Sequence, residues 1–433
     1  MVCFSSSARW SSFALLLAAG TSAYSVTSAQ LLARTGATLP GLNGNVSSLN
    51  AGIRSTNGQI AFTGSYVNSA GAANWFLFAG NQAVVRADDL PAVSAAEATV
   101  GISNAGDYVY SFSVSGIDSV RNSSGVVLEE GDAVPTMPGF FTTFASRPRM
   151  ADDGTIFVVA GFTNTAGGAT QGRVLLRRGT DGTWTEIQKS GDPLPNGQSV
   201  SATGVEFGYA ISGDGTKTFH SAIGANSPFP RFLIANGTVV ASVGSPLPFG
   251  GNFQNLTTGA LAINNSGEYA FAGDTDENTA IDHFVSFGGA LVAREGGSYA
   301  GVSLAGLQPR NVALNDAGGL VHTWGNTSQQ HLFFTPTGDL AAGLRVIGTG
   351  DEVDLDGDGI ADAVVSAIRN LSTSSSHTIW LNNDGNVVFT ATLDPIGGGA
   401  AFDAILMTPV PEPATLAALG LGALALVRRR RRG

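Results

Sequence analysis

The chain has 433 residues and a formal net charge of −11. Six of its 22 Lys and Arg and one of its 33 Asp and Glu lie outside residues 30–409, so this body carries 16 basic against 32 acidic residues and is near −16. Such a surface repels nucleic acid and anionic lipid, so neither is an expected partner. The only cysteine is Cys3, so the body relies on its hydrophobic core and not on disulfides.

Residues 1–29 have the parts of a secretory signal peptide. A weakly basic start at Arg9 is followed by a short apolar stretch and then by small residues. Thr21–Ala23 and Thr27–Ala29 both suit a signal peptidase, and cleavage after Ala29 is favoured because a strand-like segment, residues 30–34, begins there. The apolar stretch is too short to span about 30 Å of hydrocarbon, so we expect export and not a transmembrane anchor.

The body, residues 30–409, repeats a short pattern: an apolar residue, a turn around a glycine, and an alternating apolar segment that predicts a strand. The turn glycines, 48 to 67 residues apart, are Gly58, Gly106, Gly154, Gly215, Gly267, Gly318 and Gly385. Three residues earlier, an Asn or Ser side chain can hydrogen-bond the turn backbone in six copies, at Ser55, Ser103, Ser212, Asn264, Asn315 and Asn382. A second strand-like element follows most turns. Repeats of this length are typical of propeller blades.

Residues 264–271 (NNSGEYAF) and 382–389 (NNDGNVVF) resemble the bacterial surface proteins called choice-of-anchor tandem-repeat NxxGxxAF proteins. The resemblance spans most of residues 31–409, although only the fifth copy matches the motif in full and the sixth has His322 in the aromatic position. It implies a secreted repeat protein with interchangeable anchors, and it implies no known activity.

Each repeat supplies three or four short strands that cannot bury both faces alone, so neighbouring repeats must stack. We therefore predict an all-β fold, a seven-bladed β-propeller. The body opens with a second element that has no turn motif before it, and its seventh copy has no second element after it. Residues 30–34 are thus expected to complete the last blade and close the ring. The alternative is an open β-solenoid or a row of small sandwiches.

Residues 354–362 predict a structural Ca²⁺ site. Carboxylates at positions 1, 3, 5 and 9 and a carbonyl at position 7 match the start of an EF-hand loop. These ligands are Asp354, Asp356, Asp358, Ile360 and Asp362. Position 12 is Val365, so the usual bidentate Glu is missing. We favour a cation over a solvated Asp/Gly turn because four carboxylates within nine residues repel one another without one.

The remaining candidates are weaker. The histidines, which show no metal-ligand spacing, are His220, His283, His322, His331 and His377. We expect them to be strand residues, with His322 in a packing position. A group of acids is expected to lie in one solvated loop: Asp274, Asp276, Glu277 and Asp282. Three basic residues, Arg34, Arg86 and Arg294, occupy matching places in their repeats, with Lys189 nearby in another repeat, and they could meet an acidic polysaccharide around the axis of a ring. We favour the alternative that they are charged strand ends in solvent.

The tail, residues 410–433, consists of a Pro-Glu-Pro motif, an uncharged apolar segment over residues 414–427 and an arginine run. Its signal residues are Val410, Pro411, Glu412, Pro413, Arg428, Arg429, Arg430, Arg431 and Arg432. Fourteen apolar residues are marginal for a membrane span, and the arginines would keep the end in the cytoplasm. This layout resembles the PEP-CTERM sorting signal. The resemblance implies processing by an exosortase-type membrane protease, with membrane contact only through the uncleaved tail.

These features together predict an exported cell-surface protein with a binding or structural role in the envelope or the exopolysaccharide matrix, without catalysis. Neither a Gly-x-Ser-x-Gly elbow nor a phosphate-binding glycine loop occurs in the sequence. The alternative is a propeller enzyme that acts on extracellular polysaccharide.

Overall fold

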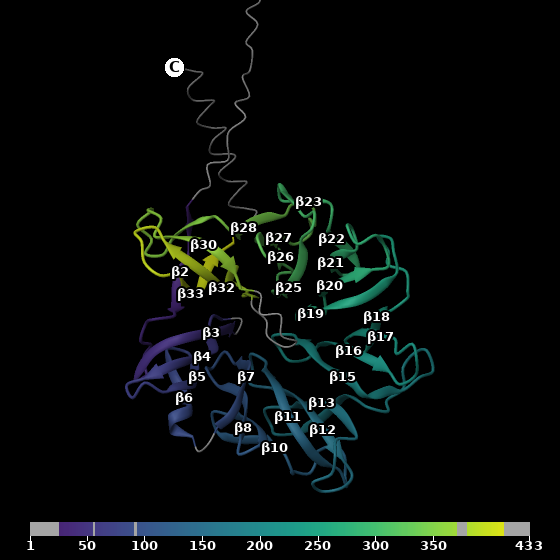
Figure 1. Cartoon of the computed structure of the whole chain (residues 1–433). Helices are drawn as coiled ribbons and strands as arrows, with labels where there is room; N and C mark the ends of the chain where they lie inside the picture. The colour runs from purple at the N-terminus through teal and green to yellow at the C-terminus, as the bar shows by residue number, and fades with distance from the viewer. Residues whose placement is uncertain (1–25, 55–56, 91–92, 370–378, 411–433) are drawn as a thin grey trace, which may run out of the picture.

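The computed structural model describes residues 26–54, 57–90, 93–369 and 379–410. This part of the chain is almost entirely β-strand, and its one helix is the 3-10 turn η1 (Ala87–Asp89). Sheets follow one another around a ring, with the first strand of each sheet toward the centre (Figure 1).

Six sheets have four strands each, joined antiparallel in chain order, and we call them the regular sheets. The first consists of β3 (Gly44–Arg54), β4 (Ile60–Asn68), β5 (Ala73–Ala79) and β6 (Gln82–Arg86). The second consists of β7 (Val93–Ile102), β8 (Tyr108–Val114), β9 (Ile117–Asn122) and β10 (Gly125–Glu129). The third consists of β11 (Phe141–Met150), β12 (Ile156–Thr163), β13 (Gly172–Arg178) and β14 (Trp184–Lys189).

The other regular sheets are β15 (Val200–Ile211), β16 (Thr218–Gly224), β17 (Arg231–Ala235) and β18 (Thr238–Ser242); β19 (Phe253–Ile263), β20 (Tyr269–Thr275), β21 (His283–Phe287) and β22 (Ala290–Arg294); and β25 (Gln308–Leu314), β26 (Leu320–Gly325), β27 (Gln330–Thr335) and β28 (Leu344–Gly348). A small hairpin, β23 (Ser298–Tyr299) and β24 (Val302–Ser303), stands between the fifth and sixth.

A seven-stranded closing sheet joins the two ends of the body, in the order β1-β29-β30-β32-β33-β2 with β31 beside β32. Its strands are β1 (Thr27–Ser28), β2 (Gln30–Arg34), β29 (Glu352–Asp354), β30 (Ala363–Ile368), β31 (Ile379–Leu381), β32 (Asn386–Pro395) and β33 (Phe402–Pro409). β2 pairs antiparallel with β33, as Leu31 lies opposite Leu406. The first and last long strands of the body therefore share one sheet.

The prediction of seven equivalent blades is wrong, because only six sheets have the regular four-stranded form. The seventh turn motif lies in the closing sheet, where β30 and β31 together occupy the place that one long strand fills elsewhere. β30 pairs with one half of β32 and β31 with the other. β29 and β1 add two further strands to this sheet.

The core consists of apolar layers between neighbouring sheets. Phe157 and Leu175 of the third sheet pack with Val205 and Tyr209 of the fourth in one such layer. The aromatic position of the repeat supplies a buried side chain in all seven copies: Phe62, Tyr110, Val158, Phe219, Phe271, His322 and Phe389. Burial between sheets thus explains why the pattern demands a large or apolar side chain there.

The structure bears on the signal-peptide prediction at residues 27–29. Thr27 and Ser28 pair in parallel with Val353 and Asp354, and Ala29 is buried. Residues 1–25 lie outside the described part of the chain. Cleavage after Ala29 would therefore separate β1 from β2, whereas cleavage after Ala23 would leave both strands in the closing sheet.

Candidate functional site

The recurrent turns are structural. The Oδ1 atom of Asn264 accepts the Glu268 backbone N–H of its own turn at 2.9 Å, and its Nδ2 donates to the carbonyl of Asn315 in the next sheet at 3.2 Å. Asn315 likewise reaches Asn382 O, at 3.1 Å. The predicted bonds to the turn backbone are confirmed for Ser103, Ser212, Asn264, Asn315 and Asn382. Ser55 is among the residues not described.

The residue after this Asn or Ser connects the sheets as well, which the sequence analysis missed. Asn265 donates from its backbone N and its Nδ2 to the two carboxylate oxygens of Asp316, both at 2.9 Å. Asp316 in turn receives a bond from Asn383 Nδ2 at 2.8 Å. The recurrence of Asn or Asp two residues before the turn glycine was the available signal. These bonds fasten the fifth and sixth sheets to the closing sheet near the axis.

A cavity of about 60 Å³ lies at the turn end of the central channel. It is encircled by the first strands of five regular sheets and by β31. Most of its lining residues are apolar, such as Leu261 and Val312, and the polar ones include Asn264, Asp316 and Arg149. The centre of the ring is therefore a concave, mixed surface that could accept a ligand.

Three arginines whose charges act on one another lie where the third and fourth sheets meet, and we call Arg147, Arg149 and Arg173 the arginine cluster. Of the three, Arg149 is the one that lines the cavity. Arg149 is 7% exposed, and its guanidinium lies over the Tyr209 ring at 5.0 Å. Within the described residues it has no hydrogen bond or ion pair, and its Nε atom is buried without a partner. Arg147 has a φ of +55° at an irregularity of β11, a backbone conformation that a side chain makes costly.

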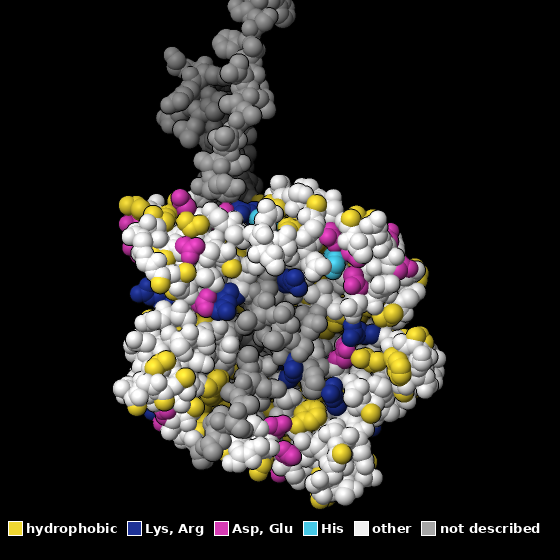
Figure 2. All heavy atoms as spheres, in the orientation of Figure 1, with side chains coloured by type: hydrophobic (Ala, Val, Ile, Leu, Met, Phe, Trp, Pro, Cys, Tyr) yellow, Lys and Arg dark blue, Asp and Glu magenta, His cyan; other side chains and the backbone are white. Residues whose placement is uncertain are grey.

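The electrostatics of the cluster are those of like charges held together. Burial, and then the charge of Arg147, lower the pKa of Arg149 to about 10. Burial and Arg147 also lower the pKa of Arg173, against the opposing effect of Glu206. Glu206 already binds Arg231 at 2.8 Å. On the face shown in Figure 2, Lys and Arg side chains gather around the centre of the ring.

The four basic residues considered for a ring around the axis do not surround it, and each lies at the end of a strand, as favoured from the sequence. Arg34, Arg86, Lys189 and Arg294 lie on the strands that end their sheets, β2, β6, β14 and β22, away from the centre (Figure 1). Arg86 binds Asp89 at 2.8 Å, Lys189 binds Asp192 at 3.3 Å and Glu186, and Arg294 binds Glu277. Arg34 lies over the Phe402 ring. Matching sequence positions place them on matching outer strands, where neighbouring groups already occupy them.

The predicted calcium loop connects β29 to β30 in the closing sheet. Asp354 accepts backbone N–H groups from Gly357 at 2.6 Å and Gly359 at 2.9 Å. These hydrogen bonds, first that of Gly359, hold the pKa of Asp354 below its usual value. Oxygen atoms of Asp354, Asp356 and Asp362 lie within 4.8 Å of one another.

The other two predicted ligands stand apart from this group. Asp358 is not part of it, and its Oδ1 accepts the N–H of Ile360 at 2.7 Å. The Ile360 side chain is exposed. The structure therefore brings together three of the four predicted carboxylates.

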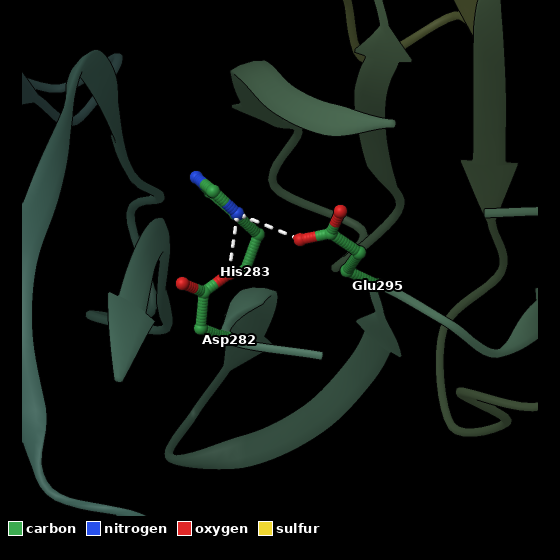
Figure 3. Close-up of side chains that lie close together, drawn as sticks. All are labelled: Asp282, His283 and Glu295. Atoms are coloured by element: carbon green, nitrogen blue, oxygen red, sulfur yellow. Dashed lines mark hydrogen bonds and ion pairs between the residues drawn. The ribbon is translucent and has the colours of Figure 1, made fainter. Parts of the chain in front are cut away.

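A second cluster, Asp282, His283 and Glu295, was not predicted, and we call it the His283 cluster. His283 Nδ1 lies 2.8 Å from Asp282 Oδ1 and 2.8 Å from Glu295 Oε2 (Figure 3). Asp282 was expected in a solvated loop and His283 in an ordinary strand position. Glu295 is twelve residues from His283 and reaches it only because β21 and β22 pair.

Two other histidines are buried without charged partners. Burial lowers the pKa of His220 to about 4 and that of His322 to about 3. Trp324 Nε1 donates to His322 Nδ1 at 3.0 Å, and the imidazole stacks on Phe333. These contacts confirm a packing position for His322. His377 is outside the described residues.

Comparison with known families identifies the chain at two levels. The model of a family described as "Family of unknown function (DUF7453)" matches residues 97–398, more than half of the chain. The chain belongs to this family. The resemblance to the NxxGxxAF repeat family is not confirmed, because DUF7453 is the family that matches the body. Among curated proteins, none matches.

The tail of this DUF7453 protein matches the PEP-CTERM protein-sorting motif over residues 409–432. The motif indicates export and surface sorting with a C-terminal anchoring tail, and it implies processing by an exosortase. Val410 is buried and bonds to Gly385 O at 2.8 Å, whereas residues 411–433 are not described. In the described part of the chain, no helix has the length and apolar character needed to cross a membrane.

Solved structures show only distant likeness. A Mycobacterium tuberculosis puromycin-hydrolyzing peptidase is 14% identical, with a TM-score of 0.41 over 84% of this chain and 54% of its own. An oligogalacturonate lyase in complex with manganese is 10% identical, with a TM-score of 0.39 over 83% and 99%. This chain spans about half the length of the peptidase. No conclusion about activity follows from either.

Proposed function

We propose that the exported body is a non-catalytic binding protein of the envelope or extracellular matrix, and that it holds acidic exopolysaccharide at the arginine cluster. The observation that carries the proposal is Arg149, a buried guanidinium that lines the central cavity without a hydrogen bond or ion pair in the described residues. A buried charge without a partner is costly, and a carboxylate ligand would offset that cost.

The chemistry of the site fits a polyanion of sugars. Guanidinium groups bind carboxylates through paired hydrogen bonds, and the neighbouring Tyr209 ring supplies an apolar face. The body as a whole is acidic, so attraction is confined to this part of the channel. Surface sorting brings the body to the place where such polymers accumulate.

The test is binding of polygalacturonate to the purified exported body, measured by calorimetry and by retention in affinity gels. We expect Arg149→Met and Arg173→Gln each to weaken binding at least about tenfold, a loss of roughly 1.4 kcal/mol, and salt to weaken it further. Arg86→Gln, on an outer strand and paired with Asp89, is the matched control and should bind as the wild type does.

The same experiment separates binding from catalysis. Shortening of the polymer during incubation would favour the alternative, an enzyme acting on extracellular polysaccharide. Unchanged binding by both cluster variants, or no binding by the wild type, would overturn the proposal.

We further propose that the loop from Asp354 to Asp362 binds a structural Ca²⁺ ion. Three carboxylates within 4.8 Å of one another and a chain of backbone bonds to Asp354 support it. An all-oxygen set of this kind suits calcium. The ion would tie β29 to β30 and so stiffen the closing sheet, and chelation followed by thermal unfolding tests this role.

A further inference from the structure

The His283 cluster gathers three side chains that commonly bind metals. Asp282 precedes β21, His283 begins it, and Glu295 follows β22. The backbone fixes this arrangement, because Glu295 N donates to His283 O at 2.9 Å. The Glu295 side chain is 6% exposed and that of His283 is 18% exposed, so the cluster is largely buried but still open on one side. Figure 3 shows both carboxylates directed at the same ring nitrogen.

A hydrogen bond from His283 does not by itself explain why two carboxylates approach the same ring nitrogen. His283 Nδ1 can carry one proton, which makes one strong hydrogen bond, yet two carboxylate oxygens lie 2.8 Å from it. The hydrogen bond goes to Glu295. Asp282 Oδ1 is buried and receives no hydrogen bond within the described residues. The Oδ1 atom of Asp282 therefore lies beside His283 Nδ1 without a hydrogen bond between them.

A metal ion accounts for these distances. In an octahedral shell, ligands about 2.0–2.2 Å from the ion and at right angles to each other are about 3 Å apart, whereas in the tetrahedral shell of Zn²⁺ they are about 3.4 Å apart. The two nitrogen–oxygen distances are close to the octahedral value. An ion also binds the unprotonated nitrogen and both carboxylates at once.

The negative charge of the carboxylates around the cluster also favours a cation at this place. Asp274 lies directly across the sheet from His283, and its Oδ1 is likewise buried without a hydrogen bond in the described residues. The neighbouring Arg294 is engaged by Glu277 and by the carbonyl of Ile281. Three carboxylates thus share a half-buried site with a single imidazole.

We propose that Asp282, His283 and Glu295, with Asp274 beside them, bind a first-row divalent metal ion through Asp282 Oδ1, His283 Nδ1 and Glu295 Oε2. One imidazole with carboxylates suits Mn²⁺ or Zn²⁺ better than the all-oxygen shell of Ca²⁺. The open side of the cluster leaves coordination positions for water or for an anionic group. This site is independent of the arginine cluster and of the loop at Asp354.

The experiment uses the full exported body, stripped of metal and kept in excess Ca²⁺ so that oxygen-only sites are filled. Mn²⁺ and Zn²⁺ are added separately, Mn²⁺ binding being followed by loss of its free electron paramagnetic resonance signal and Zn²⁺ binding by calorimetry. We expect one ion per chain. Glu295→Gln and His283→Gln should each weaken binding at least tenfold, and the matched control His331→Gln, at a buried histidine on β27, should not.

Thermal unfolding of the metal-free protein distinguishes a metal site from a structural pair. If the cluster awaits an ion, Glu295→Gln removes a repelling charge and raises Tm, while it abolishes the rise in Tm that the metal gives the wild type. If Glu295 serves only to hold His283, the same variant lowers Tm and the wild type gains nothing from metal. That outcome, or binding by Glu295→Gln equal to that of the wild type, would overturn the proposal.

Discussion

In the regular sheets, four strands follow one another along the chain, whereas the closing sheet takes strands from both ends of the body. A regular sheet forms from about forty neighbouring residues. The closing sheet needs β2 to meet β33, which lies more than 360 residues later. Its inner position is divided between β30 and β31, and it contains the loop of aspartates. Local contacts thus dominate most of the ring, and one long-range contact completes it.

Removing the first part of the body should have the largest effect, because it breaks the long-range contact. Ala33 and Leu39 are buried in a layer with Phe62 and Ile405, which joins the closing sheet to the first regular sheet. We expect deletion of residues 30–41 to cost on the order of 5 kcal/mol or more, comparable with the net stability of a domain.

Thermal unfolding and light scattering check this prediction. Removal of the exposed residues 165–167, in the connection between β12 and β13, is the control and should change Tm little. A shortened body that unfolds at the wild-type temperature and stays monomeric would show that β2 does not hold the ring together.

Acid should act on the regular sheets through His220 and His322. Their pKa values are lowered in the folded protein, to about 4 and about 3, from an ordinary 6.5. The unfolded chain therefore binds more protons below pH 6.5, and stability falls as the pH decreases toward the folded values. Each histidine should cost up to about 1.4 kcal/mol per pH unit in that range.

His322→Gln should remove its share, about 2 kcal/mol of the difference between pH 7 and pH 5. Gln retains an acceptor for the indole N–H of Trp324. Urea unfolding at the two pH values measures the change in stability. His331→Gln serves as a comparison, and its expected effect is smaller. An identical loss of stability in wild type and His322→Gln would mean that this histidine is not neutral in the folded state.

Calcium should act on the closing sheet alone. At 100 times its Kd the ion would stabilise the fold by about 2.7 kcal/mol. Chelation should therefore lower Tm, and Asp356→Ala should abolish that response. Because Asp358 lies outside the converging group, Asp358→Ala should keep most of it. A melting curve unaffected by chelator at neutral pH would show that the loop does not bind a stabilising calcium ion.

The repeat pattern predicted the all-β ring because its features are local. A turn glycine, a polar side chain three residues before it and a buried position four residues after it recur in a form that short-range physics explains. The same logic predicted that residues 30–34 would pair with the end of the body, and β2 does pair with β33. The number of regular sheets was missed because the inner position of the closing sheet is divided between β30 and β31.

The sites depend on contacts that a linear pattern does not contain. Asp354, Asp356 and Asp362 were found because a loop supplies them all. Glu295 meets His283 through strand pairing. Arg149 meets Tyr209 through the packing of two sheets, so its importance arises from burial and not from spacing. The outer basic residues do not surround the axis, because equal positions in a repeat lie at the same distance from the axis and that distance need not be the inner one.

The pairing of β2 with β33 also sets an order of events during export. β33 ends at Pro409, where the sorting motif begins. As the chain crosses the membrane from its N-terminus, β2 emerges early and must wait for its partner until almost the whole body has followed. The regular sheets can form one by one in the meantime. If the chain is exported from its N-terminus, the ring can close only after β33 has crossed the membrane, immediately ahead of the sorting motif.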